Sequence, residues 1–314
     1  MPCLWELIQK YGGDSDIRSQ EALQRRFIYS DFAHFIQTWV WKNKFIREYE
    51  DFDFIAMSVA EDLKSQNIRY VEAFISPPDF VRHGLETGRI IESVRRGLNR
   101  VAGIEVSLVV DLVRDYGESR ALATLDATVE AKGYGVLGVG IGGSEKEFPP
   151  SLYKAVYAKA RANNLKTSAH AGEAAGADSI WGAIRDLQVD RIGHGTRAVE
   201  DPNLVEYLVQ HQVPIEMCPL SNLRTQVISS IAEHPIHDFF NRGALVTVNT
   251  DDPKMFNNSL VDEFECLMED HHFTRQEVKQ LTLNALQASW LEDQKKKQLI
   301  EEISSDVSWR TPVV

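Results

Sequence analysis

The chain has 314 residues, of which 43% are hydrophobic and 25% are charged, and its formal net charge is −12. This length and composition are sufficient for a large buried core that needs no disulfide bonds. The acidic charge argues against nucleic acid as the main partner, because binding a polyanion relies on a basic surface, whereas a single nucleoside or base stays open as a ligand.

The cysteines and the hydropathy pattern exclude several other classes of protein. Cys3, Cys218 and Cys266 form no CxxC pair and are odd in number, so we expect neither a disulfide framework nor a cysteine zinc site. A cytoplasmic location suits this composition. No run of about 18 apolar residues occurs, so no membrane span is expected. Glu6 interrupts the apolar N-terminal stretch, which is therefore not typical of a signal peptide.

Seven short apolar runs alternate with stretches of helical length, as in a parallel sheet with crossover helices. In chain order the runs begin at Ile68, Ile104, Val136, Lys166, Arg191, Pro214 and Ala244. Helical patterns lie between them, and Asp201 followed by Pro202 predicts the start of one helix. Because no linker divides the chain, we expect one domain over residues 1–314, with a C-terminal helix and tail from about residue 293.

Polar side chains follow the carboxyl ends of four consecutive apolar runs. In a (β/α)₈ barrel all of these ends face one mouth, where active sites lie, whereas an open doubly wound sheet gathers them only near its switch point. The placement therefore favours an α/β barrel, although seven runs supply one strand fewer than the barrel needs. The residues in question are His170, His194, Cys218, Ser221, Asn222, Asp251 and Asp252.

His170 ends one run, and Glu173 follows it in a loop of small residues. A neutral imidazole on a rigid strand end is a suitable zinc ligand. A glutamate partly removed from water beside an aromatic substrate can hold a raised pKa and donate a proton. The alternative is a histidine that caps the next helix and a glutamate in its first turn.

His194 and the pair Asp251–Asp252 are also open to two interpretations. The two glycines that flank His194 allow a ligand to approach closely, but a buried histidine in a tight turn has the same pattern. Two adjacent carboxylates after a core strand are costly unless a metal or hydrogen-bond donors compensate them. An exposed turn before a proline is the alternative, and the apolar run before it favours the site.

Three further features are weaker. Gly143 could offer its backbone N–H to a ligand, although an ordinary loop explains it equally well. The segment around it lacks the GxGxxG pattern before a helix, so no dinucleotide cofactor is predicted. Ser221 and Asn222 could cap a helix or support the site, and Cys218 suits packing better than nucleophilic attack.

Four segments together resemble the adenosine deaminase family of metal-dependent aminohydrolases. They are HAGE at 170–173, RIGHG at 191–195, CPLSN at 218–222 and NTDDP at 249–253, and their order and spacing match the family. The likeness extends in weaker form from near the start to about residue 290. It implies a (β/α)₈ barrel of the metal-dependent hydrolase type that hydrolyses the 6-amino group of adenosine or a related purine, with one Zn²⁺ per chain.

The resemblance also implies a role for each residue. His170 and Asp251 would bind the zinc, whose bound water reaches a pKa of about 7. Glu173 would protonate purine N1, which makes C6 electrophilic, and His194 would position the zinc-bound water and help to deprotonate it.

Two residues would bind the purine itself. Asp252 would hydrogen-bond purine N7 as part of the catalytic group, and Gly143 would donate its backbone N–H to purine N3. The expected partner is therefore a small purine nucleoside or base, with no nucleic acid or membrane, and a homo-oligomer is compatible with this reading.

The sequence departs from the family in two places. None of the nine histidines forms the HxH pair that the family carries on its first barrel strand. We therefore expect strand one to be missing, through a start codon placed too late, a truncated paralogue or a deletion. The alternative function is a metal-free, non-catalytic purine-binding or relic protein. The segment GIGGSE at 140–145 replaces a DxAGDE-like segment, which leaves adenosine, deoxyadenosine, adenine and aminodeoxyfutalosine open as substrates.

Overall fold

A computed structural model describes residues 2–310 and contains one parallel sheet of seven strands. Each predicted apolar run holds one strand, and the strands pair in chain order from β1 to β7. The fold is thus an α/β, TIM-like half-barrel, as predicted, and no pairing joins β7 to β1 within the described residues. The strands are β1 Tyr70–Ile75, β2 Glu105–Asp111, β3 Val136–Gly140, β4 Lys166–Ala171, β5 Arg191–His194, β6 Ile215–Met217 and β7 Val246–Val248.

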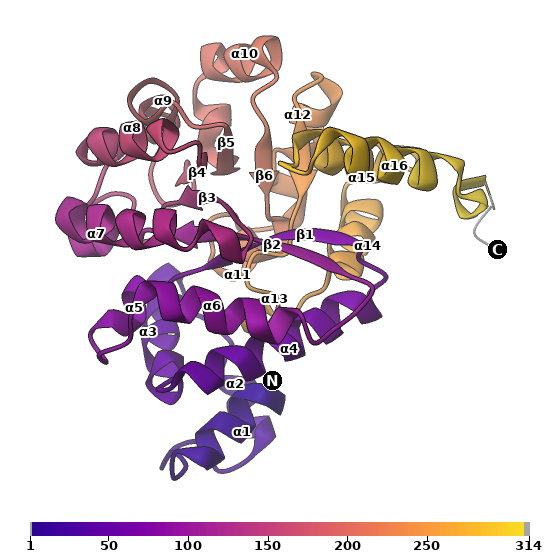
Figure 1. Cartoon of the computed structure of the whole chain (residues 1–314). Helices are drawn as coiled ribbons and strands as arrows, with labels where there is room; N and C mark the ends of the chain where they lie inside the picture. Colours follow the sequence, from indigo (N-terminus) through magenta and orange to yellow (C-terminus); the bar gives the residue numbers. More distant parts are fainter. Residues whose placement is uncertain (1, 311–314) are drawn as a thin grey trace.

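Helices surround the sheet and connect its parallel strands (Figure 1). The predicted helix start is confirmed, because the Asp201 side chain accepts the Asn203 backbone N–H at the beginning of α10. The helices are α1 Pro2–Lys10, α2 Gln20–Arg26, α3 Phe32–Lys42, α4 Tyr49–Ser65, α5 Pro78–Val81, α6 Thr87–Leu98, α7 Gly117–Glu130, α8 Lys154–Ala162, α9 Ala177–Gly182, α10 Pro202–His211, α11 Pro219–Arg224, α12 Ile236–Asn241, α13 Pro253–Phe256, α14 Leu260–Asp270, α15 Arg275–Ala288 and α16 Asp293–Ser305.

Most residues of strands β2 to β7 are buried, which explains why these strands read as continuous apolar runs, whereas the residues of β1 are half-buried or exposed. Leu108, Val109 and Val110 of β2 are fully buried, although their side chains alternate between the two faces of the sheet. The β4–β5 register places His170 beside Gly193 and Ala171 beside His194. The carboxyl ends of the two strands therefore lie next to each other.

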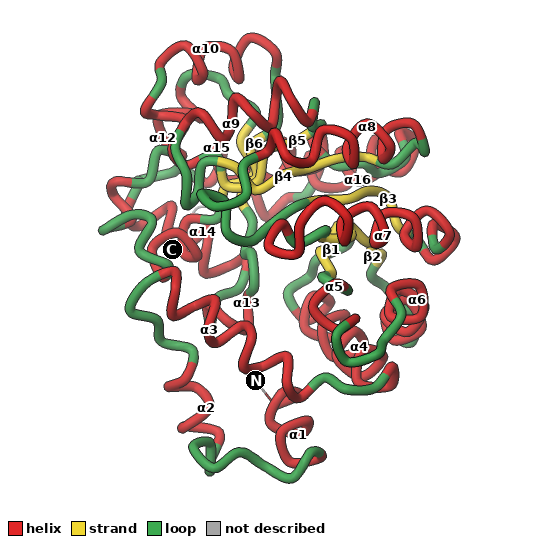
Figure 2. The backbone as a smooth tube through the Cα atoms, turned by 90° about the vertical axis from the view of Figure 1, so that its left-hand side faces the viewer, coloured by secondary structure: helices red, strands yellow, loops and turns green. Residues whose placement is uncertain are grey.

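The N-terminal helices α1 to α3 extend below the sheet in Figure 1, and Figure 2 shows α3 beside α13. Phe35 of α3 stacks on Phe256 of α13 with ring centroids 5.0 Å apart. The Tyr29 hydroxyl donates to the Met255 carbonyl at 3.0 Å. These contacts hold α3 against the segment that directly follows Asp251 and Asp252.

A polar cluster lies inside the barrel at the amino-terminal half of the strands. Arg191 forms an ion pair with Glu72 at 2.6 Å and another with Glu216 at 3.2 Å. Its guanidinium stacks on the Trp290 ring at 3.4 Å from the centroid, and the Trp290 backbone N–H donates to Glu72 at 2.6 Å. Glu72, which lies within its predicted strand, thus belongs to this cluster.

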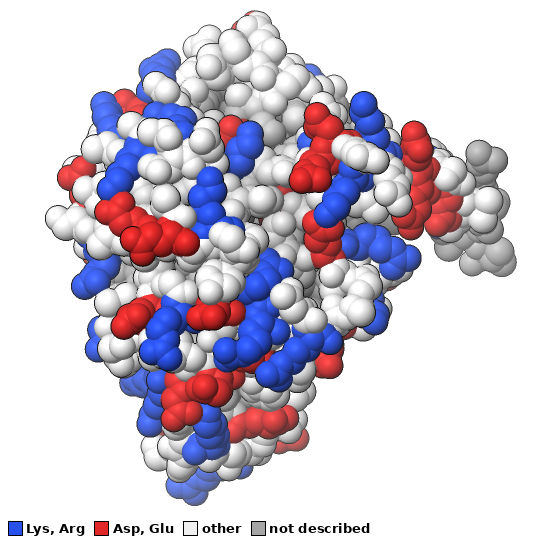
Figure 3. Space-filling model, in the orientation of Figure 1, with Lys and Arg blue, Asp and Glu red and all other residues white. Residues whose placement is uncertain are grey.

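The remaining surface and the C-terminal region add little to the site. The predicted C-terminal helix is α16, and residues 311–314 of the expected tail lie outside the described residues. Basic and acidic side chains are interspersed on the face shown in Figure 3. Within residues 2–310, no helix combines the length and the apolar character that crossing a membrane requires.

Candidate active site

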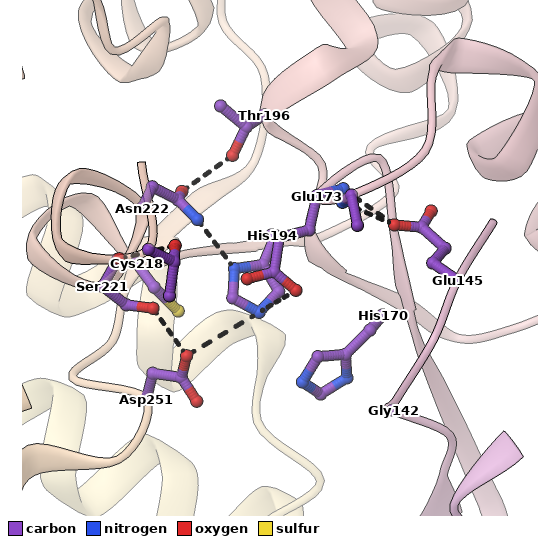
Figure 4. Close-up of polar contacts among 12 residues, drawn as sticks. Gly142, Glu145, His170, Glu173, His194, Thr196, Cys218, Ser221, Asn222 and Asp251 are labelled. Atoms are coloured by element: carbon purple, nitrogen blue, oxygen red, sulfur yellow. Dashed lines mark hydrogen bonds and ion pairs between the residues drawn. The ribbon is translucent and has the colours of Figure 1, made fainter. Parts of the chain in front are cut away.

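Three predicted site residues come together at the carboxyl ends of the strands. His170 ends β4, His194 ends β5, and Asp251 follows β7. One ligand atom from each lies within 4.8 Å of the other two, the only such group of histidine, cysteine or acidic residues found in residues 2–310 (Figure 4). The barrel thus gathers residues that lie up to 81 positions apart, from 170 to 251.

Two of these residues have an unusual backbone. His194 has a φ of 62° and Asp251 a φ of 56°, in the left-handed region that side chains other than glycine rarely adopt. Such a conformation costs about 1–3 kcal/mol and persists where the surrounding structure demands it. Strain at two of the three gathered residues supports a functional site over an ordinary turn.

The charges of the three residues suit a divalent metal. Burial and the neighbouring His194 lower the pKa of His170 to about 3, and burial lowers the pKa of His194 to about 4. Burial raises the pKa of Asp251, while His170 and a hydrogen bond from Ser221 oppose that rise. The buried Nδ1 of His170 has no hydrogen-bond partner. A neutral imidazole nitrogen and a desolvated carboxylate are donors that zinc prefers, so His170 and Asp251 fit the ion.

Glu173 is held in a position where it keeps a proton. Its side chain is nearly buried, and its Oε2 lies 3.5 Å from His194 Nε2. Burial, together with the carboxylates of Asp251 and Glu145, raises the pKa of Glu173 well above its ordinary value. A carboxyl group whose pKa is raised in this way, beside His194, is suited to act as a general acid.

Glu145 fixes the loop that carries Glu173, and the sequence gives little sign of this role. Its buried carboxylate accepts four backbone N–H groups, from Gly172 at 2.6 Å, Glu173 at 3.2 Å, Ala174 at 2.8 Å and Ala175 at 2.9 Å. Successive N–H groups that converge on one anion form a rigid loop. Figure 4 shows the Glu145 side chain reaching this loop from the opposite side to Asn222.

Arg114 is a second residue that sequence reasoning missed. Its side chain is fully buried, and Nη2 donates to the His170 carbonyl at 2.7 Å while Nη1 donates to the Phe148 carbonyl at 2.8 Å. The guanidinium therefore supports the end of β4 from behind. An isolated arginine after an apolar run carries no signal of such a position.

Ser221 and Asn222 of the CPLSN segment contact the site residues, which favours a supporting role over a helix cap. Ser221 donates to the Asp251 carboxylate at 2.8 Å. Asn222 is fully buried and lies 3.1 Å from His194 Nδ1. Cys218 is buried, its Sγ lies 3.5 Å from the Glu216 carbonyl, and burial raises the pKa of its thiol. Such a thiol stays protonated and packs, and is not a nucleophile.

The two predicted purine-binding residues border the same mouth. Gly143 has a φ of 106°, and a Cβ there would lie 2.0 Å from Asp115 Oδ2, so a larger residue would strain the backbone and displace the Asp115 side chain. Its neighbour Gly142 lies against the His170 ring. Burial and the adjacent Asp251 raise the pKa of Asp252 to about 7, with the ammonium of Lys42 opposing the rise.

A cleft of about 840 Å³ opens above Glu173. Apolar residues of α3, including Phe32 and Ile36, form one side of it, and Thr196 and Arg197 form another. The cleft reaches Glu173, whereas His170 and Asp251 lie outside its lining. Its volume is in the range of cavities that hold small organic ligands.

Comparisons with known proteins match nearly the whole chain. The sequence model described as adenosine deaminase matches residues 3–306. An adenine deaminase of Wolinella succinogenes is 33% identical over 303 residues, which cover 96% of this chain and 91% of that protein. An aminodeoxyfutalosine deaminase of Streptomyces avermitilis is 31% identical over 313 residues, covering 98% and 87%.

The solved structures agree as well. The crystal structure of an adenine deaminase from Arthrobacter aurescens has a TM-score of 0.90 and 28% identity, and the match covers 98% of this chain and 94% of that one. The barrel, the motif order and the match over nearly the whole chain point the same way. The chain belongs to the adenosine deaminase family.

Proposed function

We propose that the protein hydrolyses the 6-amino group of a purine. Water adds its oxygen to C6, the C6–N bond breaks, and ammonia leaves, so that an amino group is exchanged for a carbonyl. The observation that carries the proposal is the buried carboxyl group of Glu173, which lies 3.5 Å from His194, where His194 is grouped with His170 and Asp251. Burial and the nearby carboxylates raise the pKa of Glu173 well above its ordinary value.

Each residue of the site would have a separate role in the reaction. Glu173 donates its proton to N1, which draws electrons from C6. Asp252, whose pKa is near neutrality, shares a hydrogen bond with N7, and the Gly143 backbone N–H donates to N3. His194 orients the attacking water. These contacts hold the ring in the plane that the reaction needs.

His170 and Asp251 would hold the zinc, with Ser221 orienting the Asp251 carboxylate. Zinc, when bound, lowers the pKa of water towards about 7 and so supplies the nucleophile at neutral pH. Two protein ligands are fewer than the three that catalytic zinc sites usually have. Zinc affinity is therefore the property that separates the enzyme from a metal-free purine-binding protein.

The names of the relatives support an order in which candidate substrates should be tested. Adenine and an aminodeoxyfutalosine-type nucleoside are named for the relatives of 33% and 31% identity. We therefore place adenine first, ahead of adenosine. An aminodeoxyfutalosine-type nucleoside is the second candidate, because it is named for the relative of 31% identity.

The test combines zinc content with ammonia release. Zinc per chain is measured by elemental mass spectrometry, and ammonia release is followed with adenine, adenosine, deoxyadenosine and aminodeoxyfutalosine. Glu173→Gln keeps the shape but removes the acid, and we expect turnover to fall by about 10²–10⁴-fold. Glu206→Gln, an exposed change on α10, is the matched control. Purine binding without ammonia release by the zinc-loaded protein, or normal turnover in Glu173→Gln, would overturn the proposal.

A further inference from the structure

Three buried residues behind His194, namely Thr196, Asn222 and His234, form a hydrogen-bonded cluster. Asn222 is at its centre, with Thr196 and His234 on one side and His194 on the other. All four side chains are buried, and His234 is only 2% exposed. Groups this far from water must match donors with acceptors, so the proton positions follow from the geometry.

The backbone N–H of Ile236 determines which nitrogen of His234 carries the proton. The Ile236 N–H points at His234 Nδ1, 3.3 Å away. A backbone N–H can only donate, so Nδ1 of His234 is an acceptor and carries no proton. Burial lowers the pKa of His234 to about 3, so the ring is neutral and its one proton lies on Nε2.

His234 and Thr196 fix the orientation of the Asn222 amide. His234 Nε2 lies 3.2 Å from Asn222 Oδ1, and the Thr196 hydroxyl lies 2.8 Å from the same oxygen. The reverse orientation would direct the amide NH₂ group at the N–H of His234, leaving two donors face to face. The oxygen therefore faces His234, and the NH₂ group faces His194 Nδ1 at 3.1 Å.

The Asn222 amide in turn determines which nitrogen of His194 carries the proton. An amide NH₂ group can only donate, so His194 Nδ1 is an acceptor as well. The proton of the neutral His194 ring is then on Nε2. This N–H points towards Glu173 Oε2 at 3.5 Å and Asp251 Oδ2 at 3.9 Å, distances longer than an ordinary hydrogen bond. It is thus offered to a ligand placed between the carboxylates (Figure 4).

We propose that His234 and Asn222 are positioning residues that hold His194 in its Nε2–H tautomer. A protonated Nε2 has no lone pair, so it neither binds a metal nor takes a proton from water. His194 then acts as a hydrogen-bond donor to the attacking water, in place of the base suggested by the resemblance. Metal binding is left to His170 and Asp251.

The tautomer is measured on the free protein, without metal or substrate. The full chain is prepared with ¹⁵N-labelled histidine, and two-bond ¹H–¹⁵N spectra distinguish a protonated Nε2 from a protonated Nδ1. His194→Gln identifies the His194 signals by their loss. We expect Nε2–H for both His194 and His234, and an Nδ1–H tautomer at His194 overturns the proposal.

Variants test the relay itself. In Asn222→Asp the carboxylate only accepts, so His194 should change to the Nδ1–H form. In His234→Leu the amide loses one of its two donors and can turn, so both tautomers of His194 should appear. His234→Gln can still donate to Asn222 and should restore the Nε2–H form. An unchanged His194 spectrum in the folded Asp or Leu variant overturns the relay.

Turnover supplies the second readout and rests on the proposed function. We expect His234→Leu to lower kcat by about 10–100-fold with little change in KM, and His234→Gln to recover most of the loss. His237→Gln, three residues along and in contact with His271 and Phe273, is the control. If no purine is deaminated, the proposed function fails, yet the tautomer measurement still decides the present inference.

Discussion

Removing the Glu145 side chain should disorder the loop that presents Glu173. In Glu145→Ala four backbone N–H groups lose their acceptor. Gly172 and Glu173 are buried, so their amides find no water, whereas Ala174 and Ala175 are partly exposed and can be solvated. Each buried, unsatisfied donor costs about 1–3 kcal/mol. The expected loss of unfolding free energy is therefore about 2–6 kcal/mol.

The conservative variant separates the charge from the shape. Glu145→Gln keeps one acceptor oxygen, which can face the three amides that Oε2 now accepts, but its NH₂ group then meets the Gly172 N–H. One hydrogen bond is lost, so we expect a cost of about 1–3 kcal/mol. Both variants should also lower kcat, because the Glu173 carboxyl loses its fixed position.

Urea denaturation followed by circular dichroism gives the unfolding free energy, and ammonia release gives kcat. Glu130→Ala, which removes an exposed carboxylate from α7, controls for the change in net charge. If Glu145→Ala unfolds at the same urea concentration as the parent and turns over at the same rate, then Glu145 does not hold this loop and the reasoning is wrong.

Three further predictions follow from the site. Zinc at 100 times its dissociation constant should raise the unfolding free energy by about 2.7 kcal/mol, which calorimetry would show. His170→Ala should abolish this increase. An equal increase in the variant would contradict the assignment of His170 as a ligand. Ser221→Ala removes the hydrogen-bond donor to Asp251 and should weaken zinc binding by about 10–100-fold. A chelator competition measures the zinc affinity, with Thr225→Val as the control. An unchanged affinity in Ser221→Ala would contradict the role of Ser221. Burial raises the pKa of Glu263 from 4.5 to about 8. The stability that its proton provides is complete below pH 4.5 and is lost as the pH rises through 8, with a slope of up to about 1.4 kcal/mol per pH unit. Glu263→Gln should remove this slope in urea titrations between pH 5 and 9, and a slope equal to that of the parent would refute the assignment.

The strands and the main site residues could be read from the sequence because each depends on local pattern. An apolar run that ends in a polar residue marks both a buried parallel strand and its carboxyl end. His170, His194 and Asp251 each follow this pattern, and the barrel then brings them within 4.8 Å of one another. For Ser221 the sequence left two interpretations open, a helix cap or a support for the site, and its hydrogen bond to Asp251 favours the second.

The supporting residues could not be read in this way. Glu145 accepts hydrogen bonds from residues 27 to 30 positions later in the chain. His234 contacts Asn222, which lies 12 positions earlier. Arg114 reaches the His170 carbonyl across 56 positions. Nothing in the local sequence distinguishes these charged or polar residues from exposed ones, because their burial is decided by the packing of distant loops.

The cluster around Arg191 has a consequence for the way the chain folds during synthesis. Glu72 is synthesised well before its partners. Its carboxylate pairs with Arg191, 119 positions later, and accepts a hydrogen bond from the Trp290 backbone N–H, 218 positions later. Leaving a buried charge without its partner costs about 3–5 kcal/mol. The early strands therefore gain their final stability only when residue 290 has left the exit tunnel. Until Trp290 is in place, the Glu72 carboxylate lacks one of its partners, and the sheet passes through partly folded states that expose apolar surface.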